Sequence, residues 1–261
     1  MKWLFRWNYW LGFLGIFVML DEVKANRPEH ICIYKKWLGE DFSPNFDQDF
    51  SLIICNHLGI YEIQYLMYKY APGFIAKSSI KSYPFIGFIA EKLDTLWIDR
   101  SDKNSRNEIF TLLKQRQSDY INKKVLSPLI VFPEGTTTNG SHILKFKIGA
   151  FDSLLPIKPI IFEPDHKSIG EGISSSVISM TYDFITFNHV FKFYELPVIY
   201  PTDYMYQNYK SIYPEKNLSN GEIYSEVARE IMCEISGNQK SDKSYNDWLN
   251  YKSIVFNTKM K

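Results

Sequence analysis

Short apolar runs alternate with segments of helical periodicity along this 261-residue chain. Residues 51–55 (SLIIC) and 129–132 (LIVF) each read as a short buried strand. In the segments 59–70 and 104–124, by contrast, apolar residues recur at the spacing of a helix face. Strands that alternate with helices are typical of a parallel sheet, because the helix supplies the crossover that two parallel strands need. The sequence therefore predicts an α/β fold with a largely parallel mixed sheet flanked by helices.

The remaining elements follow the same alternation. Further strands are expected at 73–76, 95–98, 157–162 and 190–198. Further helices are expected at 85–93, from about 148, and at 222–235 with Ser219 or Asn220 as its cap. A hydrophobic fraction of 45% over 261 residues is enough for one core domain with additions and too little for two.

Charge and cysteine content argue against two classes of protein. The formal net charge is +1, whereas a nucleic-acid-binding domain usually has a basic surplus. Cys32, Cys55 and Cys233 are few and form no CxxC pair, so neither a disulfide framework nor a zinc site is expected. We therefore expect no nucleic-acid partner, no metal and a reducing compartment.

The N-terminus has two readings. Residues 9–20 (YWLGFLGIFVML) are apolar, and a full membrane span needs about 20 such residues. The run is therefore expected to be a helix that anchors the chain, either as a short or tilted span or lying in the interface. The alternative is a signal peptide, with Lys2 and Arg6 before the apolar run and a cleavage site at residues 23–25. Two acidic residues directly after the run fit cleavage poorly, so we favour the anchor.

Three of the expected strands end in polar residues that no core requires. These residues are Asn56 and His57, Asp99 and Arg100, and the sequence PEGT at 133–136. In open α/β sheets, binding sites gather outside the carboxyl ends of the strands. The three strand ends therefore predict one functional site.

His57 and Glu62 could form a catalytic pair at the first strand end. On one continuous helix a spacing of five residues places two side chains about 140° apart, which is poor for contact. If the helix begins near Gly59, however, Glu62 can reach back to the imidazole. The carboxylate then fixes the tautomer, and the other ring nitrogen can act as a general base. The pair alone favours a blander reading, in which His57 caps the helix and Glu62 is solvated.

Four blocks of sequence favour the catalytic interpretation of His57 and Glu62 instead. They are NHLGIYE (56–62), LWIDR (96–100), FPEGTTTNG (132–140) and LPIKPI (155–160). The set resembles the four blocks of the glycerolipid acyltransferases, the superfamily of acylglycerol-phosphate and lysophospholipid acyltransferases. The histidine block followed by FPEGT at this separation is a specific signal. With LKFKIGAF after it, the chain looks most like the branch that acylates lysophosphatidylcholine and lysophosphatidylethanolamine.

The resemblance implies a role for each matching residue. His57 corresponds to the catalytic base and Glu62 to the carboxylate that orients it. The positions that correspond to acceptor binding are Arg100, Glu134, Gly135, Thr136, Thr137 and Lys147. The implied reaction moves an acyl group from acyl-CoA, as co-substrate, to a free glycerol hydroxyl, with no metal and no other cofactor.

The chemistry of these residue types fits a phosphorylated acceptor. Backbone amides at Gly135 and Thr136 and the threonine hydroxyls can donate to phosphate oxygens, and Arg100 can offer a bidentate fork. Glu134 is expected to anchor the loop or to bind a hydroxyl, because a carboxylate repels phosphate.

Two residues depart from the pattern of the family. Glu62 stands where the family usually has aspartate. Thr137 stands where the branch that forms phosphatidic acid commonly has arginine. A phosphomonoester is nearly dianionic and a phosphodiester is monoanionic, so one fewer cation suits an acceptor that carries choline or ethanolamine. Two alternatives stay open, namely a CoA-independent transacylase and a catalytically weak lipid-binding protein.

The expected organisation is a membrane anchor at 1–30, an acyltransferase catalytic domain at 31–236 and a polar tail at 237–261. Tyr245 and Trp248 would lie on an interface-seeking helix in that tail. The expected partners are acyl-CoA, a lysophospholipid and the membrane surface.

The expected location follows from a glycosylation sequon at Asn139. A glycan there would block the predicted headgroup site, and the resemblance implies acyl-CoA, which is chiefly cytosolic. We therefore expect a membrane-associated protein, at the endoplasmic reticulum, with its site facing the cytosol.

Overall fold

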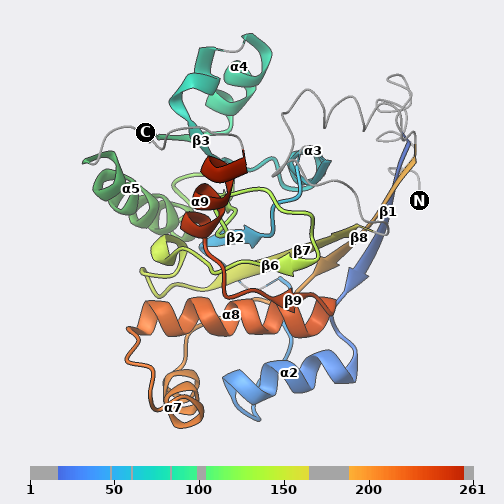
Figure 1. The fold of residues 1–261 in the computed structure, drawn as a ribbon, viewed down its shortest axis with the longest axis vertical. Coiled ribbons are helices and arrows are strands. Elements are labelled where there is room, and N and C mark those ends of the chain that lie inside the picture. The colour runs from blue at the N-terminus through green and yellow to red at the C-terminus, as the bar shows by residue number, and fades with distance from the viewer. Residues whose placement is uncertain are drawn as a thin grey trace.

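The computed structural model describes residues 17–47, 49–59, 61–82, 84–98, 104–164 and 188–255, and a five-stranded sheet lies at its centre (Figure 1). From one edge to the other, its strands are β1 (Phe17–Lys24), β8 (Asn188–Glu195), β7 (Ile157–Pro164), β2 (Leu52–Cys55) and β5 (Ile130–Val131). Only β7 and β8 pair antiparallel among these strands, and the other three pairings are parallel. The expected α/β fold with a largely parallel mixed sheet is confirmed.

A two-stranded parallel sheet adjoins β5. It consists of β3 (Ile75–Lys77) and β4 (Leu96–Ile98), joined through the 3₁₀ helix η1 (Ser78–Ser82) and the helix α4 (Pro84–Lys92). Gly73 bridges it to the main sheet, since the Gly73 amide donates to Pro128 O and the Gly73 carbonyl accepts from Ile130 N, each at 2.9 Å. A Cβ at Gly73 would lie 2.6 Å from the Leu93 carbonyl oxygen, so this close approach needs glycine.

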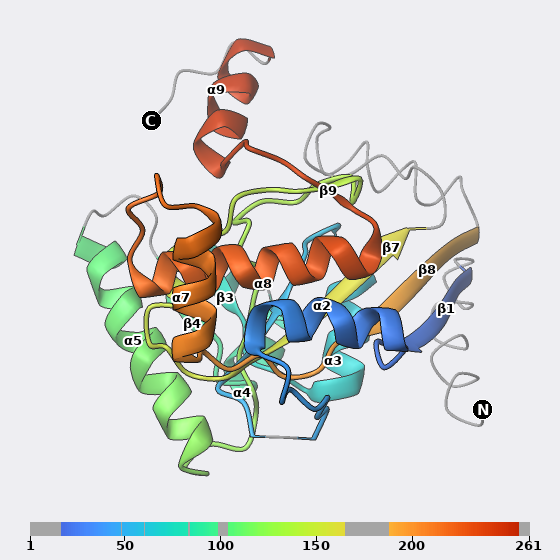
Figure 2. The same cartoon turned by 90° about the horizontal axis from the view of Figure 1, so that it is seen from below.

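Helices cover the sheet on both sides. They include α2 (Pro28–Leu38), α3 (Tyr61–Tyr70), α5 (Asn104–Ile121), α7 (Asp203–Ile212) and α8 (Asn220–Ser236). Figure 1 and Figure 2 show α2, α7 and α8 together on one face, with α3 on the other. Successive side chains of a strand point to opposite faces, and β2 and β7 are apolar on both. The cluster on the α8 side includes Leu52, Ile54, Ile157 and Ile161. The cluster on the α3 side includes Ile53, Cys55, Ile160 and Phe162.

The helix α8 starts where the sequence predicts. Ser219 is its N-cap and forms a capping box with Glu222, in which each side chain accepts from the other residue's backbone N–H. The helix ends at Gly237, which has a φ of 74° in the left-handed region.

The C-terminal segment returns to the loops above the sheet. Its strand β9 (Gln239–Lys240) pairs parallel with β6 (His142–Ile143), and the helix α9 (Tyr245–Val255) follows. A helix was expected around Tyr245, and α9 is that helix. It stands away from the layer formed by α2, α7 and α8 (Figure 2).

The expectation that the apolar run 9–20 forms a helix is wrong for the part that the structure describes. Phe17–Leu20, the end of the apolar run, lies in the strand β1 and not in a helix, because its backbone pairs in register with β8. No helix in the described part of the chain is long and apolar enough to cross a membrane. Residues 1–16 lie outside the described residues, so the anchor stays a prediction.

Three other elements differ from the sequence-based expectation. The helix expected from about 148 is a single 3₁₀ turn, η2 (Ile148–Ala150), since the chain must reach the start of β7 only a few residues later. The helices α2 and α7 were not expected. Both bury a few large side chains against α8, among them Trp37 and Tyr209, and their apolar patterns are short.

Candidate active site

His57 directly follows the end of β2, in a turn fixed by its neighbour Asn56. The Asn56 side chain donates to Phe162 O and accepts from Phe162 N, both at 2.8 Å. The side-chain amide thus continues the pairing of β2 with β7 beyond the last strand residue. This places the His57 side chain outside the carboxyl end of the sheet, where the sequence predicts the site.

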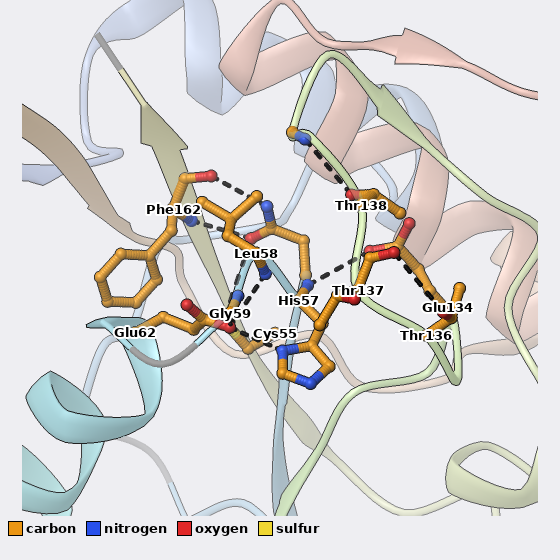
Figure 3. Close-up of polar contacts among 12 residues, drawn as sticks. Cys55, His57, Leu58, Gly59, Glu62, Glu134, Thr136, Thr137, Thr138 and Phe162 are labelled. Carbon is orange, nitrogen blue, oxygen red and sulfur yellow. Dashed lines mark hydrogen bonds and ion pairs between the residues drawn. The ribbon is translucent and has the colours of Figure 1, made fainter. Parts of the chain in front are cut away.

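Glu62 reaches back from the first turn of α3 to the His57 turn. Its Oε1 lies 2.6 Å from His57 Nδ1 and accepts from Leu58 N at 2.9 Å and Gly59 N at 2.7 Å (Figure 3). Because Oε1 acts as an acceptor for two backbone amides, we assign the proton of the His57–Glu62 bond to Nδ1. The lone pair is then on Nε2, the nitrogen that can act as a base.

The two members of the pair differ in exposure. The Glu62 side chain is 1% exposed, and its Oε2 is buried without a hydrogen-bond partner among the described residues. The His57 side chain is 20% exposed and stacks on the Phe132 ring, with centroids 4.1 Å apart and planes at 16°. The imidazole is therefore held on one face and on its Nδ1 edge, while the carboxylate that holds it is closed to water.

Glu134 is a buried carboxylate with both oxygens engaged. Its Oε1 accepts from His57 N at 3.3 Å, and its Oε2 accepts from Leu144 N at 2.9 Å. Burial raises the pKa of Glu134 to about 7, although these two bonds and the nearby His57 and Arg229 act in the opposite direction. Of the two roles that the sequence allowed, the contacts match anchoring of the loop.

The threonine-rich loop, residues 133–140, is tied to the histidine turn. Thr138 N donates to His57 O at 2.8 Å, and the Thr138 hydroxyl accepts from Gly140 N at 3.3 Å. Thr136 is buried and Thr137 is half-buried. The Gly135 amide donates to Phe132 O at 3.0 Å, and its expected donation to a ligand stays a prediction. The bond closes a turn whose central residues are Pro133 and Glu134.

Lys147 brings a positive charge to this loop. Its amide donates to Pro133 O at 2.8 Å, which fixes the backbone of Lys147 beside the loop. A Cβ built on Gly135 would lie 2.3 Å from Lys147 Nζ, so the ammonium group lies close against the backbone of Gly135. Arg100, the other cation of the predicted site, lies outside the described residues, as does Asp99.

Sequence reasoning missed two supporting residues, Phe132 and Leu144. Phe132 lies inside a quoted block, so its position next to site residues was a usable signal. Leu144 contributes through its backbone amide, which no side-chain pattern reveals. In the described part of the chain, no group of three or more His, Cys, Asp or Glu side chains is arranged to hold a metal ion.

Comparison with known proteins identifies a family. Residues 39–163 match the family model described as Acyltransferase. The chain is 28% identical over 176 residues to a lysophospholipid acyltransferase of Arabidopsis thaliana. This alignment covers 66% of this chain and 32% of the relative. It is 25% identical over 205 residues to a lysophosphatidylcholine acyltransferase of Drosophila melanogaster. This second alignment covers 75% of this chain and 35% of the relative. The chain thus spans about a third of the length of these two curated relatives.

A solved structure is also similar. The crystal structure of the 1-acyl-sn-glycerophosphate acyltransferase of Thermotoga maritima aligns with a TM-score of 0.48 and 18% identity, covering 90% of this chain and 78% of that chain.

The matched range 39–163 contains every predicted site residue, from His57 to Lys147. The histidine turn, the threonine-rich loop and Lys147 therefore all lie in the region that the family model describes. Residues 39–163, the part of the chain that holds the site, match the acyltransferase family, and both curated relatives are acyltransferases.

Proposed function

We propose that the protein is an O-acyltransferase that moves a fatty acyl chain from acyl-CoA to the free glycerol hydroxyl of a lysophospholipid. The observation that carries this proposal is the 2.6 Å contact between His57 Nδ1 and the buried Glu62 carboxylate. This contact leaves Nε2 of the partly exposed His57 ring available as a base at the carboxyl end of the sheet. The threonine-rich loop lies next to it, with the positive charge of Lys147 beside that loop.

The reaction follows from this arrangement. His57 Nε2 takes the proton of the acceptor hydroxyl as its oxygen attacks the thioester carbonyl. The new C–O bond forms, the C–S bond breaks, and the CoA thiolate takes up the proton held on the imidazolium. Glu62 keeps the ring in one tautomer and stabilises its positive charge during the step. The threonine-rich loop and Lys147 hold the phosphate of the acceptor, and Arg100 supplies a second cation there.

Among acceptors, we favour lysophosphatidylcholine or lysophosphatidylethanolamine, while 1-acylglycerol-3-phosphate remains an alternative. Thr137 gives this loop one cation fewer than an arginine at that position would. The monoanionic phosphodiester of the first two acceptors needs less positive charge than a phosphomonoester.

The proposed acceptor also places the protein at a membrane, because lysophospholipids partition into bilayers. The residues before β1, apolar from Tyr9 onward, are the proposed anchor, and the endoplasmic reticulum, with the site facing the cytosol, is the proposed location.

The test is an acyl-transfer assay on purified protein. A panel of lysolipids is incubated with and without acyl-CoA, and the products are identified by mass. We expect a diacyl phospholipid that forms only with acyl-CoA, and a fall of at least about 10²-fold in kcat for a folded His57→Ala variant. Product formed from phospholipid alone would favour a transacylase. Lysolipid binding without any product would favour a lipid-binding protein.

A further inference from the structure

We propose that the C-terminal segment, residues 239–255, is part of the acceptor site, and that Tyr245 positions the Lys147 ammonium group for the acceptor phosphate. The segment lies outside residues 39–163, the range that matches the family model. The inference rests on the proposed function, because it assigns the acceptor phosphate to Lys147.

The contact between Tyr245 and Lys147 carries the inference. Lys147 Nζ lies 4.0 Å from the centroid of the Tyr245 ring, within the range of a cation–π interaction. The same nitrogen approaches the α-carbon of Gly135 so closely that a Cβ there would lie 2.3 Å away. The ammonium group is thus held between the aromatic ring of α9 and the backbone of the threonine-rich loop.

Backbone pairing brings the C-terminal segment to this place. β9 pairs with β6, just before Lys147 in the sequence, and Ser241 N donates to Ile143 O at 3.0 Å. Lys145 N donates to Lys243 O, also at 3.0 Å. From below, the buried Arg229 of α8 donates to Ser241 O at 2.9 Å. The segment is therefore held on two sides before it reaches Tyr245.

The start of α9 is fixed as well. Ser244 donates its amide and its hydroxyl to Asp247 Oδ2, each at 2.7 Å, as in a helix N-cap. Tyr245 is the first residue of the helix, and the Trp248 ring stacks on it with centroids 5.8 Å apart. The Tyr245 ring is thus held by backbone pairing, a cap and a stacked neighbour.

An aromatic ring suits the task of holding this cation. An exposed lysine has several rotatable bonds, and ordering them when a ligand binds costs free energy. The face of a ring orients an ammonium group without bringing a negative charge, whereas a carboxylate partner would compete with the acceptor phosphate for the same cation. Tyr245 therefore helps to order Lys147 without itself adding a negative charge that would compete with the phosphate.

The experiment compares ring-keeping and ring-removing variants of Tyr245 in steady-state acyl transfer to lysophosphatidylcholine. We expect Tyr245→Leu to raise the KM for the lysolipid about two- to fivefold, the factor expected for one exposed cation–π contact. The kcat and the KM for acyl-CoA should stay close to wild type, and Tyr245→Phe should retain the wild-type KM. In a Lys147→Ala background, Tyr245→Leu should cause no further change.

A second cation–π pair provides the matched control. Lys216 Nζ lies 4.2 Å from the Tyr213 ring centroid, at the C-terminal end of α7. Lys216→Ala and Tyr213→Leu should leave the KM for lysophosphatidylcholine unchanged. A Tyr245→Leu protein with the wild-type KM, or a Tyr245→Phe protein as impaired as Tyr245→Leu, would overturn the inference.

A binding measurement separates the two proposals. Binding of lysophosphatidylcholine to a His57→Ala protein, with and without Tyr245→Leu, does not depend on turnover. If the wild type transfers no acyl group but Tyr245→Leu still weakens this binding, the proposed acyl transfer fails, and only the role of Tyr245 and Lys147 in lysolipid binding stands. If transfer is observed but Tyr245→Leu changes neither the KM nor the binding, the inference alone fails.

Discussion

At the scale of residues, the site separates an accessible base from the buried charge that orients it. Glu62 Oε1 receives three contacts, from the His57 ring and from the amides of Leu58 and Gly59. The same oxygen therefore closes the turn and sets the tautomer of the base. A change at Glu62 affects both the local backbone and the chemistry, and two conservative variants can separate these effects.

The first prediction concerns the charge of Glu62. Glu62→Gln keeps an oxygen for the two backbone amides but removes the negative charge beside the imidazolium, so kcat should fall by about 10²-fold or more. Glu62→Asp keeps the charge, although it shortens the reach, and should retain more activity than Glu62→Gln. The measurement is kcat for lysolipid acylation, with circular dichroism to check the fold.

Glu40→Gln is the matched control, because Glu40 is exposed and its ion pair with Lys35 lies on the surface. It should behave as wild type. Equal activities of Glu62→Gln and wild type would show that the carboxylate charge is not needed for catalysis.

The second prediction concerns Glu134 and the dependence of stability on pH. Its pKa is raised to about 7 from an ordinary value of 4.5, so between these pH values the folded state binds more protons than the unfolded state. The free energy of unfolding should therefore fall by at most about 3 kcal/mol as the pH rises from 4.5 to 7. Above pH 7 it should no longer change. Glu134→Gln should remove this dependence.

Urea unfolding of both proteins from pH 5 to pH 8 measures the effect. Glu215→Gln, at an exposed position, controls for the loss of one negative charge. A difference between wild type and Glu134→Gln that is constant over this pH range would contradict the prediction.

At the scale of elements, α8 supports the site from below. It packs on the sheet through one apolar face, and its Arg229 also holds the segment that leads to α9. Because α8 both packs on the sheet and holds this segment, we expect its N-terminus to be stabilised by a cap. The capping box of Ser219 and Glu222 provides that fixation.

The third prediction tests this cap. Ser219→Ala removes the hydroxyl that accepts from Glu222 N, and the free energy of unfolding should fall by about 1 kcal/mol. Ser211→Ala is the control, because Ser211 is also exposed but lies at the end of α7 and serves no N-cap. It should change the stability by less than about 0.5 kcal/mol. Urea denaturation measures both, and equal effects of the two substitutions would argue against a role for the cap.

At the scale of the whole molecule, the fourth prediction concerns the side of the membrane. Asn139 is exposed in the folded protein, so a glycosylating compartment could modify it. We expect the full-length chain, expressed in a eukaryotic cell, to pellet with membranes and to stay unglycosylated. Protease added outside intact microsomes should cleave the chain around Asn139. A glycan at Asn139, or a mature protein that starts near Asn26, would contradict this topology.

Local patterns predicted most of the elements, and β1 is an exception with a clear physical cause. The strands of the parallel core and α8 have strong apolar periodicity or clear caps, which are properties of neighbouring residues. β1 was mistaken for part of a helix, because an apolar stretch by itself does not show whether its backbone bonds are made within a helix or across to another strand. That choice depended on β8, which is distant in the sequence.

The sequence by itself was enough to predict the chemistry of the site. The resemblance of its four blocks to those of the glycerolipid acyltransferases, in the same order along the chain, predicted His57 as the base and Glu62 as its partner. These features are local, because a strand end and the first turn of the next helix are set by adjacent residues.

Only the tertiary structure decided how the site is held together. It showed that both oxygens of Glu134 and the Gly135 amide are used inside the protein. It also showed that Tyr245 lies against Lys147, although the two are far apart in the chain. Such contacts depend on the pairing of distant backbone segments, here β6 with β9, which a pattern of neighbouring side chains does not encode.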